Sequence, residues 1–170
     1  LTSMNPLIHL HPSIVHFPIA LLLLGSLAAL GHLYGLARFV PYTDLRRTAW
    51  LLLLLGWLAT LPAILSGLLA QSGLPPDEPY RWTLNWHIGT AVALALIYGV
   101  VLYRGWLFQG AKARKARARA SNASGAADLL DDPASRVWLT FALLVGMVLI
   151  VATGFNGGQL VYEWAVNVKG

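Results

Sequence analysis

The sequence contains no cysteine among its 170 residues. This absence excludes disulfides, thiolate–metal sites, iron–sulfur clusters, covalently attached c-type haem and cysteine nucleophiles. Charge is also scarce, because Asp, Glu, Lys and Arg together make up 11% of the chain, against about 25% in soluble domains. Hydrophobic residues make up 57%. This composition argues against a soluble catalytic domain and a nucleic-acid-binding surface, and it indicates a membrane protein.

Charged residues are missing from four long windows, residues 1–37, 48–76, 82–103 and 137–162. A helix needs about 20 apolar residues to cross the hydrocarbon core of a bilayer, so each window is long enough. We predict spanning helices at about 13–36, 48–71, 84–106 and 136–162, with a loop at 107–135. The expected fold is all-α, a bundle of four transmembrane helices that forms a single integral membrane domain over residues 1–170.

The basic residues indicate an orientation. Four spans place both termini on one side, and ten of the twelve Lys and Arg residues lie in the connections on the other side. Cytoplasmic segments of membrane proteins carry an excess of Lys and Arg. We therefore expect a multi-pass protein of the bacterial inner membrane, with the 107–135 loop in the cytoplasm and both termini in the periplasm.

The first and third predicted spans share a pattern near their periplasmic ends. Each has a histidine, then proline or glycine two residues later, then alanine after two more. The two sets are His16, Pro18 and Ala20 and, in the third span, His87, Gly89 and Ala91. The second and fourth spans carry a small hydroxyl residue before glycine, at Ser66-Gly67 and Thr153-Gly154. Such a pattern would make the chain two parallel αα-hairpin repeats, with His16 and His87 at the same depth.

His16 and His87 are the main candidates for a functional site. An ionisable side chain inside a span is costly and usually points into the bundle. Both lie in the first turns of their predicted helices, where the helix dipole favours neutral imidazole, the form that binds metals. We predict that His16 and His87 are the metal ligands at the two axial positions of a b-type haem, near the periplasmic face.

The other histidines leave alternatives open. His11 supports or replaces one of the two ligands, because Pro12 makes the helix start irregular. His9, His11, His16 and His87 together would also suit copper. A quinone hydrogen-bonded to a histidine is a third possible cofactor for the site. A further alternative is that the two histidines only form structural hydrogen bonds and bind no cofactor. His32 lies about 24 Å from His16 along an ideal helix, so we expect it to be hydrogen-bonded near the cytoplasmic face.

These residues predict a membrane electron-transfer subunit rather than an enzyme. We find no nucleophile motif, phosphate-binding loop or paired carboxylates in the chain. The alternatives are an accessory subunit without redox chemistry, within a larger respiratory or photosynthetic complex, and a quinone-binding subunit. Expected partners are membrane lipid, a larger membrane protein complex and a periplasmic cytochrome, with no nucleic acid.

Three segments resemble a known family. They are His11-Pro12-Ser13-Ile14-Val15-His16-Phe17-Pro18-Ile19-Ala20-Leu21, the pair Trp86-His87, and Gly157-Gly158-Gln159-Leu160-Val161-Tyr162. Together they are similar to the bacterial four-helix membrane family called domain of unknown function 2231, over nearly the whole chain.

The resemblance implies an integral membrane protein of this size and topology, associated with c-type cytochrome modules and suspected of binding haem. It carries over His11, His16, His87 and a turn at Gly157-Gly158. Relatives often have His-Gly two residues after the tyrosine, where this chain has Trp164-Ala165. A ligand at that position in relatives would have no counterpart here.

Overall fold

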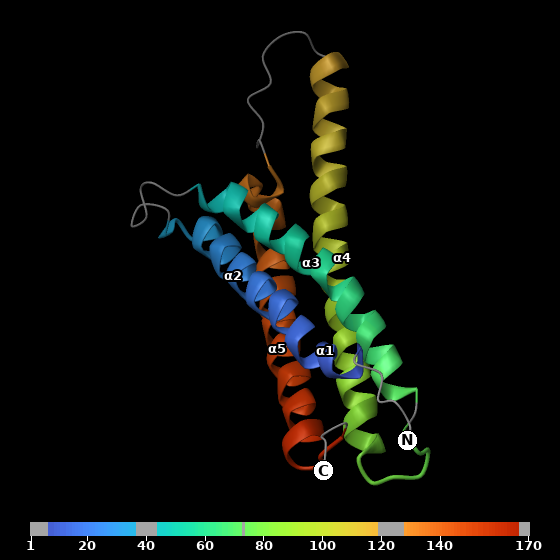
Figure 1. Ribbon diagram of the computed structural model, residues 1–170. Helices are drawn as coiled ribbons and strands as arrows, with labels where there is room; N and C mark the ends of the chain where they lie inside the picture. Colours follow the sequence, from blue (N-terminus) through green and yellow to red (C-terminus); the bar gives the residue numbers. More distant parts are fainter. Residues whose placement is uncertain (1–6, 37–43, 73, 119–127, 167–170) are drawn as a thin grey trace.

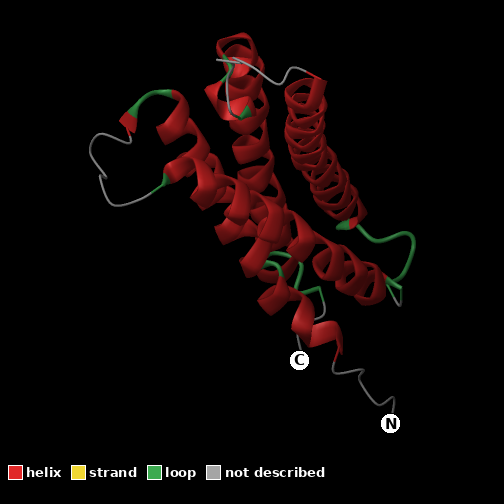
Figure 2. Ribbon diagram, turned by 90° about the horizontal axis from the view of Figure 1, so that it is seen from above, coloured by secondary structure: helices red, strands yellow, loops and turns green. Residues whose placement is uncertain are grey.

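A computed structural model describes residues 7–36, 44–72, 74–118 and 128–166, with side chains from 11–36, 44–72, 74–110 and 128–166, and every element in this part is helical (Figures 1 and 2). The elements are α1 (Leu7–Ile14), α2 (His16–Leu33), α3 (Leu45–Gln71), α4 (Arg81–Ala118), the 3₁₀ helices η2 (Leu129–Asp131) and η3 (Pro133–Ser135), and α5 (Arg136–Tyr162). Four helical segments are long and apolar enough to span a membrane: His11–Leu33, Leu45–Gln71, Arg81–Gly110 and Pro133–Tyr162. The predicted all-α fold with four potential spans is confirmed.

The bundle has two distinct ends. The start of α1 and the end of α5 lie at one end, which we call the terminal end (Figure 1). The opposite end, called the loop end, carries the end of α2, the start of α3, and η2 and η3. Both ends of the described chain therefore share one side of the bundle, as an even number of spans requires.

Helix α4 departs most from the predicted limits. It continues to Ala118, past residue 106 and into the predicted loop at 107–135. The predicted span ended near residue 106 because charged residues follow it. Ala, Lys and Arg nevertheless favour helix in water, so the helix can continue outside the membrane. A helix of 38 residues is about 57 Å long, while the hydrocarbon core is about 30 Å thick. Helix α4 therefore projects beyond its neighbours at the loop end (Figure 1).

The first span is divided at Val15 into α1 and α2. Pro18 lies in the first turn of α2, and because proline has no N–H, the carbonyl of Ile14 lacks its helical donor. The chain changes direction between the two helices (Figure 1). His11 is therefore on α1 and His16 is the first residue of α2, so the two side chains do not follow one ideal helix.

The four long helices form two hairpins. Helix α2 packs mainly against α3, and α4 mainly against α5. Each hairpin closes where a large side chain lies on a glycine: a Cβ at Gly56 would be 2.8 Å from Cγ of Leu22, and one at Gly146 would be 2.7 Å from Cζ of Tyr98. Leu22 and Tyr98 have no exposed surface. Small residues allow this close approach between helices in a bilayer, where burial of apolar surface contributes little.

One buried hydrogen bond joins the two hairpins. The Tyr98 hydroxyl of α4 lies 2.7 Å from Oγ of Ser26 on α2, and Ser26 Oγ donates to the carbonyl of Leu22 at 2.7 Å. Since the single hydroxyl hydrogen of Ser26 is used in that bond, Tyr98 is the donor to Ser26. This pair ties α2 to α4 in the interior of the bundle.

The hairpins repeat the same packing at shifted positions. A shift of 76 residues takes Leu22 to Tyr98 on the first helices, and a shift of 90 takes Gly56 to Gly146 on the second helices. The second shift also relates two pairs of buried residues, Ala49 with Leu139 and Leu53 with Leu143. The hairpins thus correspond in packing, as expected from two parallel repeats, but a shift of 76 aligns His11, not His16, with His87. The predicted equivalence of His16 and His87 was wrong because it compared sequence patterns without the packing that fixes the register.

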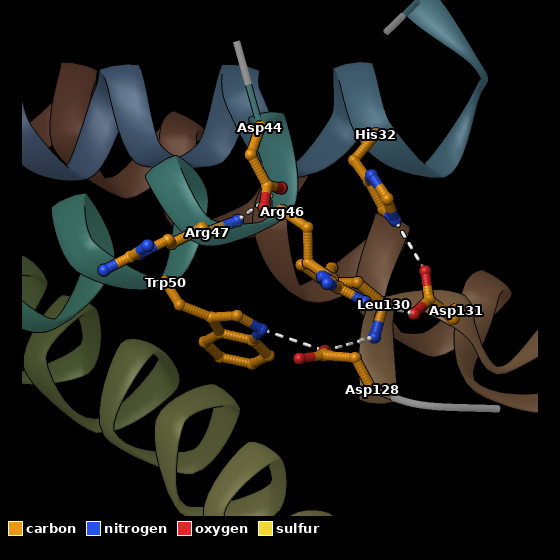
Figure 3. Close-up of polar contacts among 8 residues, drawn as sticks. All are labelled: His32, Asp44, Arg46, Arg47, Trp50, Asp128, Leu130 and Asp131. Atoms are coloured by element: carbon orange, nitrogen blue, oxygen red, sulfur yellow. Dashed lines mark hydrogen bonds and ion pairs between the residues drawn. The ribbon is translucent and has the colours of Figure 1, made fainter.

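Two carboxylates clasp the loop end (Figure 3). Asp131 accepts hydrogen bonds from Nε2 of His32 at 2.7 Å and from Nη1 of Arg46 at 3.0 Å. Asp128 is buried and accepts from Nε1 of Trp50 at 2.9 Å and from the backbone N–H of Leu130 at 3.0 Å. The segment before α5 is thereby fixed to α2 through His32 and to α3 through Arg46 and Trp50. The expected hydrogen bond of His32 is confirmed, and its partner is Asp131.

The start of α5 also follows its sequence signals in part. Asp132 caps a helix that has Pro133 in its first position, and it accepts from the N–H of Ala134 and the hydroxyl of Ser135. The helix that it caps is η3, and α5 begins directly afterwards at Arg136. The short 3₁₀ turn therefore leads the chain into the fourth span.

The first prediction concerns pH and Asp131. Partial burial raises the pKa of Asp131, but the hydrogen bonds from His32 and Arg46 outweigh this and lower it below its ordinary value. The ionised carboxylate therefore stabilises the fold above its unfolded pKa of about 3.9, and this contribution is lost as pH falls through the lowered folded value. We expect Asp131→Asn to remove about 1 kcal/mol at pH 7 and to weaken the loss of stability below about pH 4.

Thermal unfolding in detergent from pH 7 to pH 3 measures this effect. Asp77→Asn is the matched control, because Asp77 is exposed in the loop between α3 and α4. Equal acid sensitivity of the Asp131→Asn protein and the unmodified protein would contradict a stabilising role of the Asp131 carboxylate.

The second prediction concerns the bond between Tyr98 and Ser26. Interhelical hydrogen bonds in membrane proteins contribute about 0.6 kcal/mol on average. Tyr98→Phe and Ser26→Ala should each lower stability in detergent, and a double-mutant cycle should show a coupling of about that size. Tyr103→Phe serves as the control, because Tyr103 is 58% exposed. Additive effects of the two changes would mean that the hydroxyl groups do not interact.

Candidate functional site

A cavity of about 470 Å³ opens at the terminal end of the bundle, between all the helices that meet there. Its wall is built mainly from apolar side chains and glycines. His11, His16 and His87 all line it. None of the described residues that line it is Asp, Glu, Lys or Arg. The cavity therefore combines an apolar wall with three imidazoles, a composition typical of a site for a largely apolar ligand with a few fixed polar contacts.

His87 is held by the backbone of α5. Its Nδ1 lies 2.9 Å from the carbonyl oxygen of Thr153. A carbonyl only accepts hydrogen bonds, so Nδ1 carries the hydrogen and donates it. The neutral ring then has its free lone pair on Nε2. Metal-binding histidines are commonly fixed in this way, because the second nitrogen donates to a backbone carbonyl.

His11 reaches the same state through a hydroxyl on α3. Its Nδ1 lies 2.9 Å from Oγ of Ser66, and Ser66 Oγ donates to the carbonyl of Ala63 at 2.9 Å. Because the Ser66 hydrogen is already used, Nδ1 of His11 must donate to the hydroxyl. The lone pair of His11 is therefore also on Nε2.

The two imidazoles form a close pair. The ring centroids of His11 and His87 are 6.3 Å apart, and the ring planes are at 89°. Both side chains are half-buried. One ring comes from the first hairpin and the other from the second. The equivalence established by packing therefore places one histidine from each repeat at a common point.

Each ring lies against a glycine of the facing helix. A Cβ at Gly67 would be 3.0 Å from Cε1 of His11, and a Cβ at Gly157 would be 3.0 Å from Cε1 of His87. The shift of 90 residues that relates α3 to α5 takes Gly67 to Gly157 and Ala63 to Thr153. Both histidines therefore have an equivalent seat, made by a carbonyl and by a glycine four residues later.

The expected turn at Gly157-Gly158 is not present. Both glycines lie within α5, which continues to Tyr162. A glycine in this position costs helix stability, but here it leaves room for the His87 ring. Gly157 therefore allows the close approach of a side chain of α4 rather than a turn.

The separation of the two rings can be compared with that of two imidazoles bound to one metal. A metal–nitrogen bond to imidazole is about 2.0 Å long, and the nitrogen is about 1 Å from its ring centroid, so two such rings have centroids about 6 Å apart. The observed 6.3 Å fits this separation. The described residues contain no group of three or more His, Asp or Glu side chains that could hold a metal ion. A metal held by these two imidazoles would need its remaining ligands from elsewhere, and a haem supplies them through its own ring nitrogens.

Thr153 contributes a further polar atom to the wall. Its Oγ1 is buried and has no hydrogen-bond partner in the part of the chain that the structure describes, and Thr153 lines the cavity. A buried hydroxyl without a partner is uncommon in folded proteins. It offers one hydrogen bond to a bound group beside His87.

The predicted site residues are divided by the structure. His11 and His87 come together, whereas His16 is exposed and its Nδ1 donates to the carbonyl of Pro12 at 2.5 Å. His16 lines the same cavity but is not part of the ring pair. The side chain of His9, which the copper alternative requires, lies outside the described residues. His32 is at the loop end with Asp131.

Sequence reasoning did not assign Ser66 or Thr153 to the site. Both had been noted only as small hydroxyl residues before glycine. The sequence signal for this part of the site is a shared spacing, because Ala63 and Thr153 each precede a glycine by four residues. This spacing becomes meaningful only after the two hairpins are aligned. His11 was expected either to support the site or to replace one of its two ligands, because Pro12 makes the start of the helix irregular.

The fold and the cavity define a helical membrane protein with four potential spans and a histidine-lined site at one end. The family model described as "Predicted membrane protein (DUF2231)" matches residues 7–170, and the chain belongs to this family. Among curated proteins and among solved structures, no match to the chain was found. The family resemblance expected from the sequence is confirmed.

The third prediction tests the seat of His87. Gly157→Leu should displace the His87 ring, because even a Cβ would be 3.0 Å from its Cε1. We expect a loss of about 1–3 kcal/mol, as is usual for overpacking. Gly158→Leu is the matched control, since a Cβ at Gly158 has no atom within 4 Å. Thermal unfolding in detergent compares the two proteins, and an equal effect of both substitutions would contradict the contact with His87.

Proposed function

We propose that this protein is a membrane electron-transfer subunit in which His11 and His87 hold a b-type haem between the two hairpins. The observation that carries the proposal is the ring pair: two imidazoles from equivalent positions, 6.3 Å apart, inside an apolar cavity. Both have Nδ1 committed to a hydrogen bond, which leaves both Nε2 atoms available.

The chain supplies binding, orientation and exclusion of water. His11 and His87 would provide the two axial nitrogens, and Ser66 and the Thr153 carbonyl fix the rings in the metal-binding tautomer. The apolar wall keeps the site dry. A haem bound there supplies reversible one-electron oxidation and reduction of its iron. The proposal takes His11 in the position that the sequence had suggested for His16.

The position of the site supports exchange of electrons at the periplasmic side. The cavity is at the terminal end, and ten of the twelve basic residues belong to connections that leave the spans at the other end. By the excess of positive charge in cytoplasmic segments, the terminal end faces the periplasm in this proposal. A periplasmic cytochrome is the expected electron partner, and membrane lipid and a larger membrane complex are the expected surroundings.

The fourth prediction concerns the two ligands. Protein purified from haem-supplied cells should show a Soret band and an α band that appears on reduction with dithionite. His11→Gly and His87→Gly should each lose this spectrum, because neither ring can be replaced by the other. Added imidazole should restore the bands in both variants by occupying the vacated position, which a merely unfolded protein could not do.

His16→Ala distinguishes the two possible partners of His87. We expect this variant to retain the haem spectrum, since His16 is outside the ring pair. If His16→Ala loses the bands while His11→Gly keeps them, the ligand pair is the one suggested by the sequence pattern. A haem-supplied protein without a Soret band would overturn the proposed function.

A further inference from the structure

His16 occupies an unusual place for a polar side chain. It lies inside the first potential span, five residues after its start at His11, and is the first residue of α2. Its side chain is nevertheless exposed, and it lines the cavity that contains the ring pair. The next residue, Phe17, is 67% exposed and is not among the lining residues. His16 therefore stands at an opening of the cavity, within a segment long and apolar enough to span a membrane, where an unsatisfied polar group is costly.

The ring of His16 has a defined hydrogen-bonding state. Nδ1 donates to the carbonyl of Pro12, because a carbonyl can only accept. Nε2 of the neutral ring is then an acceptor. Within the part of the chain that the structure describes, Nδ1 is the only ring nitrogen of His16 that has a hydrogen-bond partner. Nε2 of His16 is thus an acceptor at the opening of the cavity, and apolar residues such as Ile19 and Leu68 line the cavity with it.

We propose that this opening binds the head group of a lipid-soluble quinol, with Nε2 of His16 accepting a hydrogen bond from one quinol hydroxyl. The proposal rests on the proposed function, since the haem held by His11 and His87 would receive the electrons. A quinol fits this opening because it combines a flat apolar ring with hydroxyl donors and reaches the site through the bilayer. A lipid phosphate fits poorly, since no lining residue in the described chain carries a positive side chain of Lys or Arg.

The electrons and protons of quinol oxidation are removed one pair at a time. Oxidation of the quinol breaks its two O–H bonds and releases two electrons and two protons. Nε2 of His16 takes the proton of the hydroxyl bound to it, and an oxidised haem held by His11 and His87 would supply a one-electron acceptor. The second electron and proton would leave by the same route once a one-electron acceptor outside the membrane had reoxidised that group. Both protons leave to the water at the terminal end, and the product is the quinone.

The fifth prediction tests binding without relying on haem. Decylubiquinone, a quinone with a short tail, is titrated into the haem-free protein in lipid nanodiscs, and heat of binding is measured. A neutral His16 has an acceptor at Nε2 and can donate to a quinone carbonyl only when it is protonated. Decylubiquinol, whose hydroxyls are donors, is therefore titrated in parallel under reducing conditions. We expect saturable binding of the quinol, about fivefold weaker in His16→Leu through loss of one hydrogen bond. His16→Gln, which keeps an acceptor oxygen, should recover much of the affinity.

Phe17→Leu is the control for changes beside the opening, and it should bind the quinol like the unmodified protein. In the haem-loaded protein, decylubiquinol should reduce the haem more slowly in His16→Leu, while dithionite reduces both proteins equally. Absence of saturable quinol binding, or equal affinity of His16→Leu and the unmodified protein, would overturn this inference. Absence of a Soret band would instead overturn the proposed haem, so the two failures are distinguishable.

Discussion

The structure depends on close contacts between large side chains of one helix and glycines of the next. Leu22 lies on Gly56 in the first hairpin, and Tyr98 lies on Gly146 in the second. Within a bilayer the helices gain little by hiding apolar surface from water, so van der Waals contact at short separation is a main source of their attraction. The same contacts fix the rotation and the height of each helix. They therefore decide which side chains can meet at the terminal end.

The two ends of the bundle use polar groups differently. At the loop end, Asp128 and Asp131 accept hydrogen bonds from Trp50, Arg46 and His32, so these polar groups find their partners within the protein. At the terminal end, two imidazoles and the Thr153 hydroxyl face a cavity in an apolar wall. A folded protein seldom keeps buried polar atoms without partners unless they serve a purpose. Among the described residues, the polar groups of the loop-end network are paired with one another, whereas the cavity at the terminal end keeps an unpartnered hydroxyl at Thr153.

Much of the fold could be predicted from the sequence, because charge-free windows and the length needed to cross a bilayer leave few alternatives. The limits of α4 could not, since the residues after Trp106 form helix in water as readily as in lipid. The histidine at position 87 was placed correctly in the first turns of its helix. Its relation to His11 was not predictable, because the break at Val15 changes the direction of the chain between His11 and His16. The roles of Ser66 and Thr153 required the alignment of the two hairpins, which only the glycine contacts reveal.

The supports of the two rings are alike in position but not in chemistry. The imidazole at 87 donates directly to a peptide oxygen, whereas the one at 11 donates to an alcohol that in turn donates to a peptide oxygen. An assembly of two identical hairpins would have to use the same support twice. Fusing both halves into one polypeptide frees each half to mutate separately. Evolution can then adjust the basicity of one nitrogen while leaving its counterpart unchanged.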